Sequence, residues 1–306
     1  MPLNDETRER LEGWKRAAMA LAPLLLGEPL TDTPDELRIR YNRELARNTP
    51  PPGVTVSTVD MDGIPAALVR PDTTYGDRTL LYIHGGGYFS GGSAGYYGIA
   101  GHFAKKLGAS VYIPDYRLAP EHPFPAALED VVKAYAWLKC KATHAERIAF
   151  VGDSAGGAMV VSAMVRARNA GIGLPAGGVA ISPWANLEMT GSSYTTRDGI
   201  DPLCTRDILM IMARAALGTT RPNDPEASPV FADVRGLPPI LVQIGESEVM
   251  LSDAIRLATH LGDARVRTSL EIWPDMFHVW PIFAGVLPEA DQAIESASDF
   301  LNRMML

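Results

Sequence analysis

From residue 54 onward, short apolar runs alternate with longer segments of helical periodicity. The runs Leu80–Ile83 and Ile148–Val151 are continuously apolar, as expected of strands that are buried on both faces. This alternation predicts an α/β fold with a mostly parallel sheet and helices on both sides. The predicted strands are Val54–Val59, Ala66–Val69, Thr79–Ile83, Ser110–Ile113, Ile148–Val151, Val179–Ile181, Ile240–Ile244 and Leu270–Ile272, and the predicted helices are Tyr97–Leu107, Phe124–Lys139, Ala155–Asn169, Ser252–Leu261 and Glu289–Met304.

Two stretches lack strand signals. The first 50 residues predict helices, with an N-cap, a first-turn proline and a capping-box glutamate at residues 33–36. The second stretch, from Ser182 to Pro239, contains one predicted helix at Arg206–Leu217. We therefore expect N-terminal cap helices over residues 1–50 and a catalytic domain over residues 51–306 with a cap insertion at about 183–230. The cap would cover the carboxyl edge of the sheet, where open α/β sheets bind ligands.

The charge and the cysteine content argue against several classes of function and indicate a cellular location. The chain has 306 residues, a net charge of −8 and no Lys/Arg run, so the electrostatic footprint of a nucleic-acid or anionic-lipid binder is absent. Its two cysteines, Cys140 and Cys204, have no metal-ligand neighbours at useful spacing and favour a reducing, cytoplasmic location. The apolar run Ala17–Leu26 is shorter than the roughly 20 residues that span a bilayer, and acidic residues precede it, so we expect a cap helix and no stable membrane anchoring.

The strongest chemical motif is Gly152-Asp153-Ser154-Ala155-Gly156. It lies directly between a predicted strand and a predicted helix, where a sharp turn exposes the serine oxygen above the sheet and requires very small neighbours. A second G-x-S-x-G pattern surrounds Ser93 but follows a glycine-rich loop. The context therefore predicts Ser154 as the nucleophile and Ser93 as loop structure.

Two further segments complete this chemistry. Residues His84–Gly87 follow a strand with three consecutive glycines, so their amides, with that of Ala155, could bind the oxyanion of a tetrahedral intermediate. A plain glycine-rich turn is the alternative. Among the histidines, only His278 stands late in the chain after a strand, as the order serine, acid, histidine demands.

Together these stretches resemble the hormone-sensitive-lipase-like branch of the α/β hydrolases, the bacterial family IV carboxylesterases. The resemblance implies an eight-stranded, mostly parallel sheet with a helical cap, no cofactor and no metal, and oxyanion-hole amides from Gly86, Gly87 and Ala155. It spans residues from about 75 to 285. The matching stretches are His84–Gly87, Asp115–Glu121 with Phe124–Ala127, Gly152–Gly157, Ser182–Trp184, Gly236–Pro239 and Met276–His278.

The acid of the triad is the one departure from this family. The family usually has aspartate three residues after the glycine that ends the seventh strand, whereas this chain has Glu248. We predict Glu248 as the acid, since its carboxylate can still reach the imidazole. Three carboxylates compete: Glu246, expected on the other side of the turn; Asp253, expected to begin the next helix as a solvated or capping residue; and Asp275, too near His278 in sequence to face its ring.

The predicted activity is hydrolysis of short- to medium-chain carboxylic esters through an acyl-enzyme intermediate. Hydrolysis of lactones or amides with the same triad is the alternative, because leaving-group preference depends on pocket shape. A binding module such as the plant gibberellin receptor of this branch is disfavoured, because such a receptor loses the histidine. Tyr88, Phe89, Trp184 and Tyr194 are candidate pocket walls. An edge strand near Ser269–Ile272 would leave backbone groups unpaired, which predicts a homodimer through that strand.

Overall fold

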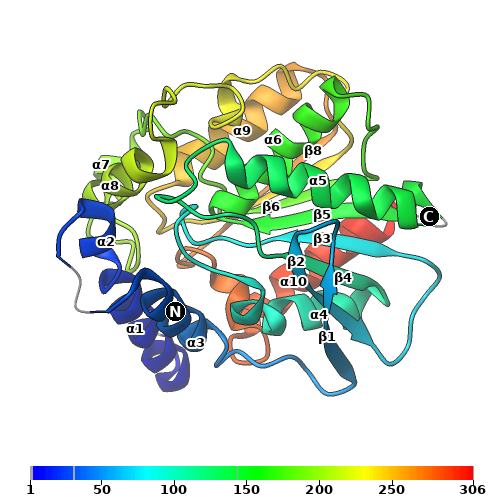
Figure 1. Ribbon diagram of the computed structural model, residues 1–306, viewed down its shortest axis with the longest axis horizontal. Coiled ribbons are helices and arrows are strands. Elements are labelled where there is room, and N and C mark those ends of the chain that lie inside the picture. The colour runs from blue at the N-terminus through cyan, green and yellow to red at the C-terminus, as the bar shows by residue number, and fades with distance from the viewer. Residues whose placement is uncertain (1–2, 30–31, 143, 306) are drawn as a thin grey trace.

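The computed structural model describes residues 3–29, 32–142 and 144–305. Its centre is an eight-stranded sheet in the order β1-β2-β4-β3-β5-β6-β7-β8 (Figure 1). β1 pairs antiparallel with β2 and β2 pairs antiparallel with β4, and all other neighbours are parallel. The predicted α/β architecture is therefore confirmed. The strands are β1 Val54–Asp60, β2 Pro65–Pro71, β3 Thr79–Ile83, β4 Ser110–Pro114, β5 Ile148–Asp153, β6 Gly178–Ile181, β7 Ile240–Gly245 and β8 Thr268–Trp273.

Helices cover both faces of the sheet (Figure 1). α5, α6 and α9 share one apolar core with the sheet, and α4 and α10 contribute to a second core on the opposite face. The predicted bounds of α5, α9 and α10 differ from the observed ones by one or two residues at each end. α5 begins after Pro125, because the residue before a proline is disfavoured in a helix. The helices are α4 Tyr97–Leu107, α5 Ala126–Lys141, α6 Ala155–Asn169, α9 Leu251–Asp263 and α10 Pro288–Asn302.

Two separate parts of the chain lie together at one side of the sheet. The N-terminal helices, blue in Figure 1, lie next to the yellow-green helices of the segment between β6 and β7, and α2 contacts α8. The expected capping box at the start of α3 is present, with Thr33 Oγ1 accepting from the Glu36 amide and Glu36 Oε2 accepting from the Thr33 amide. These helices are α1 Asp5–Met19, α2 Ala22–Leu26, α3 Pro34–Leu45, α7 Ser193–Thr196 and α8 Arg206–Leu217.

The apolar run at residues 17–26 does not form one continuous helix. α1 ends at Met19, and α2 resumes at Ala22 after a turn in which Leu21 is fully buried. Across residues 3–29, 32–142 and 144–305, no helix combines the length and apolar content that a bilayer crossing requires. Ala17 and Leu21 of the run are buried in the core that α4 and α10 share, whereas Met19 and Leu26 are 64% and 51% exposed.

Arg38 on α3 connects the N-terminal helices to the loops that follow β3 and β4. Its Nε donates to the carbonyl of Phe89 at 2.9 Å, and its terminal nitrogen donates to the carbonyl of Ala119 at 2.8 Å. The same guanidinium forms an ion pair with Glu121 at 2.6 Å. Because its side chain is only 12% exposed, these bonds are partly shielded from water. The loop that follows the His84–Gly87 segment is therefore braced from the N-terminal region.

Candidate active site

Ser154 occupies a strained turn between β5 and α6. Its φ is 55° and its ψ is −119°, a conformation that is costly for a residue with a side chain and that clusters at functional sites. The neighbouring glycines are required by space: a Cβ on Gly152 would lie 2.5 Å from the carbonyl oxygen of Gly156. The turn therefore admits only glycine at position 152, and Ser154 lines a cavity.

Ser93 has a different environment. It begins a short 3-10 helix, and its hydroxyl donates to Asp115 Oδ2 at 3.0 Å. Its backbone amide donates to the other oxygen of the same carboxylate. The serine of the second G-x-S-x-G pattern is therefore held in hydrogen bonds to Asp115. Ser93 does not line the cavity that contains Ser154.

His278 lies between Ser154 and Glu248. Its Nε2 is 3.0 Å from Ser154 Oγ, and its Nδ1 is 2.8 Å from Glu248 Oε2. The Glu248 side chain is fully buried, and its other oxygen accepts from the Ser182 hydroxyl at 2.7 Å and from the Gly245 amide at 2.6 Å. Both carboxylate oxygens are therefore fixed, which orients the imidazole toward the serine.

Ser182 is a site residue that the sequence reasoning did not single out. Its hydroxyl donates to Glu248 and accepts from the amide of Val279, the residue after His278, at 3.1 Å. One buried hydroxyl thus joins the loop that carries Glu248 to the loop that carries His278. The available signal was its place directly after β6, at the carboxyl edge of the sheet beside the other site residues.

The competing carboxylates have other partners. Asp253 accepts from the Tyr194 hydroxyl at 2.7 Å and from the Asn186 amide at 3.1 Å. It is 1% exposed and burial raises its pKa to about 8, so the expectation of a solvated or capping residue was wrong. The Glu246 carboxylate pairs with Arg197 at 2.7 Å. Asp275 is exposed at a turn with φ of 61°.

The loop after β3 presents backbone amides near Ser154. Gly86 and Gly87 have φ values of 107° and 63°, which residues with side chains rarely adopt. The loop is anchored by the Gly85 amide, which donates to Asp153 Oδ1 at 3.1 Å. No hydrogen bond to another described residue occupies the amides of Gly86, Gly87 or Ala155. They are free to bind an oxyanion.

His84 supports this loop rather than facing Ser154. Its ring stacks on Tyr116 with centroids 4.1 Å apart, and its Nδ1 lies 2.8 Å from the carbonyl oxygen of Gly85. The Tyr116 hydroxyl donates to the His84 carbonyl at 2.7 Å. Burial lowers the pKa of His84, so the neutral ring is favoured in this position.

The cavity above Ser154 has a volume of about 420 Å³. Of the four aromatic residues expected in its wall, only Phe89 lines it. Tyr88 and Trp184 are buried with ring centroids 6.2 Å apart, and the Tyr194 hydroxyl bonds to Asp253, so these three belong to the core. The apolar wall comes mainly from the N-terminal helices and the segment between β6 and β7, notably Trp14, Tyr41, Leu203, Ile208, Leu209 and Met212.

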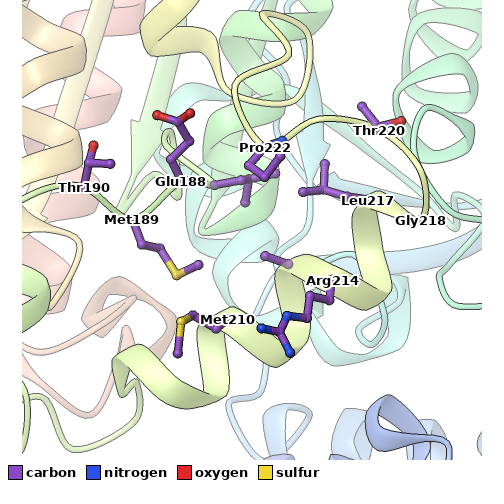
Figure 2. Close-up of a pocket in the computed structure, with 11 residues that line it drawn as sticks. Glu188, Met189, Thr190, Met210, Arg214, Leu217, Gly218, Thr220 and Pro222 are labelled. Carbon is purple, nitrogen blue, oxygen red and sulfur yellow. The ribbon is translucent and has the colours of Figure 1, made fainter.

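A second cavity, of about 610 Å³, lies against a different face of α8 (Figure 2). Figure 2 shows Met189 directed toward α8, with Met210 and Arg214 projecting from that helix. Ile208 and Met212 on the same helix face the cavity of Ser154. α8 therefore separates the two cavities.

The described residues hold no group of three or more His, Cys, Asp or Glu side chains placed to bind a metal ion. The ionisable side chains that line the cavity with Ser154 include His278, Asp153, Asp201 and Cys204. Burial raises the pKa of Asp153 to about 7 and raises that of Cys204 above its ordinary value. The thiol is therefore neutral at neutral pH.

The pH dependence of the reaction should follow His278. Burial alone lowers the pKa of His278, but contacts with Cys204 and Glu248 outweigh it and place the pKa well above its ordinary value. The protonated ring cannot accept the serine proton, so kcat/KM should rise from acid pH, with a midpoint above about 6.5, and level off on the alkaline side. Initial rates across buffers at constant ionic strength measure this curve. An optimum near pH 4 would contradict an imidazole base.

The chain is similar in sequence and in structure to known hydrolases and esterases. A family model described as alpha/beta hydrolase fold matches residues 80–282. An acetyl-hydrolase of Streptomyces hygroscopicus is 42% identical over 82% of this chain and 83% of its own length. A solved esterase of the bacterial hormone-sensitive lipase family is 40% identical, with a TM-score of 0.87 over 96% of this chain and 99% of its own. A hormone-sensitive lipase from a metagenome library is 33% identical, with a TM-score of 0.89 over the whole of both chains.

Proposed function

The chain belongs to the α/β-hydrolase fold family, in its hormone-sensitive-lipase-like branch, and from this premise we propose that Ser154, His278 and Glu248 are its catalytic triad. It is a serine-dependent carboxylic ester hydrolase, the class to which its named relatives belong. The observation that carries the assignment is the hydrogen-bonded chain from Ser154 through His278 to Glu248, in which Ser154 and His278 line the cavity of about 420 Å³.

Acylation begins when Ser154 Oγ attacks the carbonyl carbon of the ester. His278 Nε2 takes the hydroxyl proton, and the Glu248 carboxylate stabilises the resulting imidazolium. The amides of Gly86, Gly87 and Ala155 would bind the oxyanion of the tetrahedral intermediate. When the intermediate collapses, the C–O bond breaks, His278 returns the proton to the departing alcohol, and the acyl group stays on Ser154.

Deacylation repeats these steps with water. His278 deprotonates a water molecule as it attacks the acyl-enzyme carbonyl, and the same amides bind the second oxyanion. The Ser154–acyl bond then breaks and the proton on His278 returns to Ser154 Oγ. The products are one carboxylic acid and one alcohol per ester consumed.

We propose that the preferred acyl groups are short to medium, roughly two to eight carbons. The cavity lies at the small end of the volumes typical of ligand sites, and Leu209 and Met212 contribute apolar walls. Each buried methylene contributes about 0.8 kcal/mol, so kcat/KM should rise with chain length until the cavity is full and then fall.

A panel of p-nitrophenyl esters from acetate to palmitate tests the activity and the chain-length limit together. We expect the maximum in kcat/KM at or below about eight carbons. Higher kcat/KM for palmitate, or for long-chain triglyceride, would refute the size limit but leave the activity standing. A lactone and an anilide in the same panel test the alternative leaving groups: faster turnover of either would favour that class over simple esters.

We propose homodimerisation through β8 as a second property. β8 is the last strand of the sheet, and the side chains of Leu270 and Ile272 are 37% and 45% exposed. Its outer edge carries backbone groups that can pair with a second β8 strand. Light scattering at micromolar concentration should give twice the chain mass of 33.0 kDa. A mass of one chain would refute it.

We also propose a cytoplasmic location. Both cysteines are free, and Cys140 is exposed at the end of α5 while Cys204 lies between β6 and β7. Free thiols persist in reducing compartments. Cell fractionation with the untagged chain tests this proposal, and recovery outside the cytoplasmic fraction would refute it.

A further inference from the structure

The segment between β6 and β7 reaches the catalytic centre itself. Residues 201–205 all line the cavity that contains Ser154 and His278. Within this segment, Cys204 lines the same cavity as His278. These five residues therefore supply part of the cavity wall close to the proposed catalytic base.

Asp201 holds this segment in place. Its Oδ1 accepts from the backbone amides of Leu203 at 3.0 Å and Cys204 at 3.1 Å, and its Oδ2 accepts from the amide of Val249 at 3.1 Å. The residue is 4% exposed, and no cationic side chain among the described residues pairs with it. Three backbone amides on one buried carboxylate form a strong, geometrically specific tether.

The Val249 end of this tether lies next to the triad acid. Val249 directly follows Glu248, and its carbonyl also accepts from the Ser193 hydroxyl at 2.6 Å. Arg197 adds a parallel connection, because its Nε donates to the carbonyl of Glu246 at 2.9 Å. The loop of the acid is thus fastened to the cap segment at several points, and Asp201 is the only one of these groups that also binds the amide of Cys204.

We propose that Asp201 is a positioning residue for ester hydrolysis, which holds Cys204 in the cavity wall that His278 also lines and fixes that wall beside the nucleophile. This inference rests on the proposed triad. The segment between β6 and β7 would then influence the surroundings of His278 as well as the shape of the cavity.

The role of Cys204 follows from its surroundings. Burial keeps it as a neutral thiol, so it does not compete with Ser154 as a nucleophile. A thiol sulfur can accept a weak hydrogen bond, and this contact favours the protonated form of His278. The other ionisable groups that act on this histidine or its partners are Glu248 from the β7–α9 loop, Asp153 from β5 and Asp201 from the cap segment.

The test compares Asp201→Asn, Cys204→Ala and Cys204→Ser with Asp198→Asn as a matched control. Asp198 is exposed, lies three residues earlier, and loses the same charge in its variant. In Asp201→Asn the side-chain NH₂ group replaces one of the two oxygens that accept hydrogen bonds. At least one backbone N–H then faces another donor and loses its hydrogen bond. We expect kcat/KM for the preferred ester to fall roughly 10- to 100-fold through misplacement, mainly through a higher KM, and the chain-length profile to flatten. The control should behave as wild type.

The pH profile separates positioning from simple support of the fold. Cys204→Ala should move the midpoint of the kcat/KM curve to lower pH, and Cys204→Ser should restore part of the shift. Asp201→Asn should move it in the same direction, and the double variant Asp201→Asn/Cys204→Ala should add little to either single change. Concentrations of active enzyme come from fluorophosphonate titration, so loss of folded protein does not enter the rate constants.

The outcomes are distinct. If titrated Asp201→Asn keeps the wild-type KM, chain-length profile and pH midpoint, its role is structural and the inference is wrong. If Asp201→Asn does not fold, Cys204→Ala decides: an unshifted midpoint with unchanged KM overturns the inference, and a shift that Cys204→Ser partly restores supports it. A wild-type protein inert toward every ester would instead refute the proposed function.

Discussion

Replacing Ser154 with alanine should lower kcat by about 10⁶-fold, the scale seen when the nucleophile of a serine hydrolase is removed. The reason is geometric: Ser154 Oγ is the hydroxyl that lies 3.0 Å from His278 Nε2, the proposed base. Binding should survive, because the cavity walls and the free amides of the loop after β3 remain. The measurement is the burst and steady-state rate on a short-chain p-nitrophenyl ester.

Ser93→Ala is the matched control for this change. It removes a hydroxyl from the same G-x-S-x-G pattern, but that hydroxyl is bonded to Asp115. The variant should retain the catalytic rate at some cost in stability. A fluorophosphonate probe followed by peptide mapping should label Ser154 in the wild type and in Ser93→Ala. Labelling at Ser93, or full activity in Ser154→Ala, would overturn the assignment.

Glu248→Gln should lower kcat by roughly 10² to 10⁴-fold while the fold is kept. The amide can replace the carboxylate in size, but it can present a donor to His278 Nδ1 and favour the wrong tautomer. It also removes the negative charge that helps to raise the pKa of His278. The midpoint of the remaining kcat/KM curve should therefore move to lower pH. Steady-state kinetics across pH measure both effects.

Asp253→Asn is the control for the acid. Asp253 is bonded to Tyr194 and Asn186 and has a pKa of about 8, so it is mostly protonated at neutral pH and the amide is a close replacement. Its catalytic rate should stay within a few-fold of wild type. If Glu248→Gln were near wild type and Asp253→Asn collapsed, the triad acid would be Asp253.

The parts of the fold that depend on local sequence were predictable. The runs Leu80–Ile83 and Ile148–Val151 are apolar without interruption because both faces of those strands are covered, and β3 and β5 lie at the centre of the sheet. The strand–serine–helix context distinguished Ser154 from Ser93, because both serines have flanking glycines but only Ser154 lies directly between a strand and a long helix. Such signals lie within a few residues of the feature that they specify.

The pocket walls were not predictable in the same way, because they depend on tertiary packing. Aromatic residues near the motifs were natural candidates, but Trp184 and Tyr194 fill the core between the sheet and the cap. The actual wall includes Trp14 and Tyr41, which are far from the motifs in sequence and arrive through packing of the N-terminal helices. Asp253 was misread for the same reason, since the residues that bury it come from the segment after β6.

The bonds of Arg38 have a practical meaning for anyone who expresses this protein. Its guanidinium connects α3 to the carbonyls of Phe89 and Ala119, and Phe89 is part of the cavity wall. A shortened chain that begins near β1 would therefore lack the Arg38 hydrogen bonds to the loop after β3. It would also lack Trp14 and Tyr41, which line the cavity. Affinity tags and fusion partners are better placed after α10, because that end of the chain lies on the opposite side of the molecule from the N-terminal helices (Figure 1).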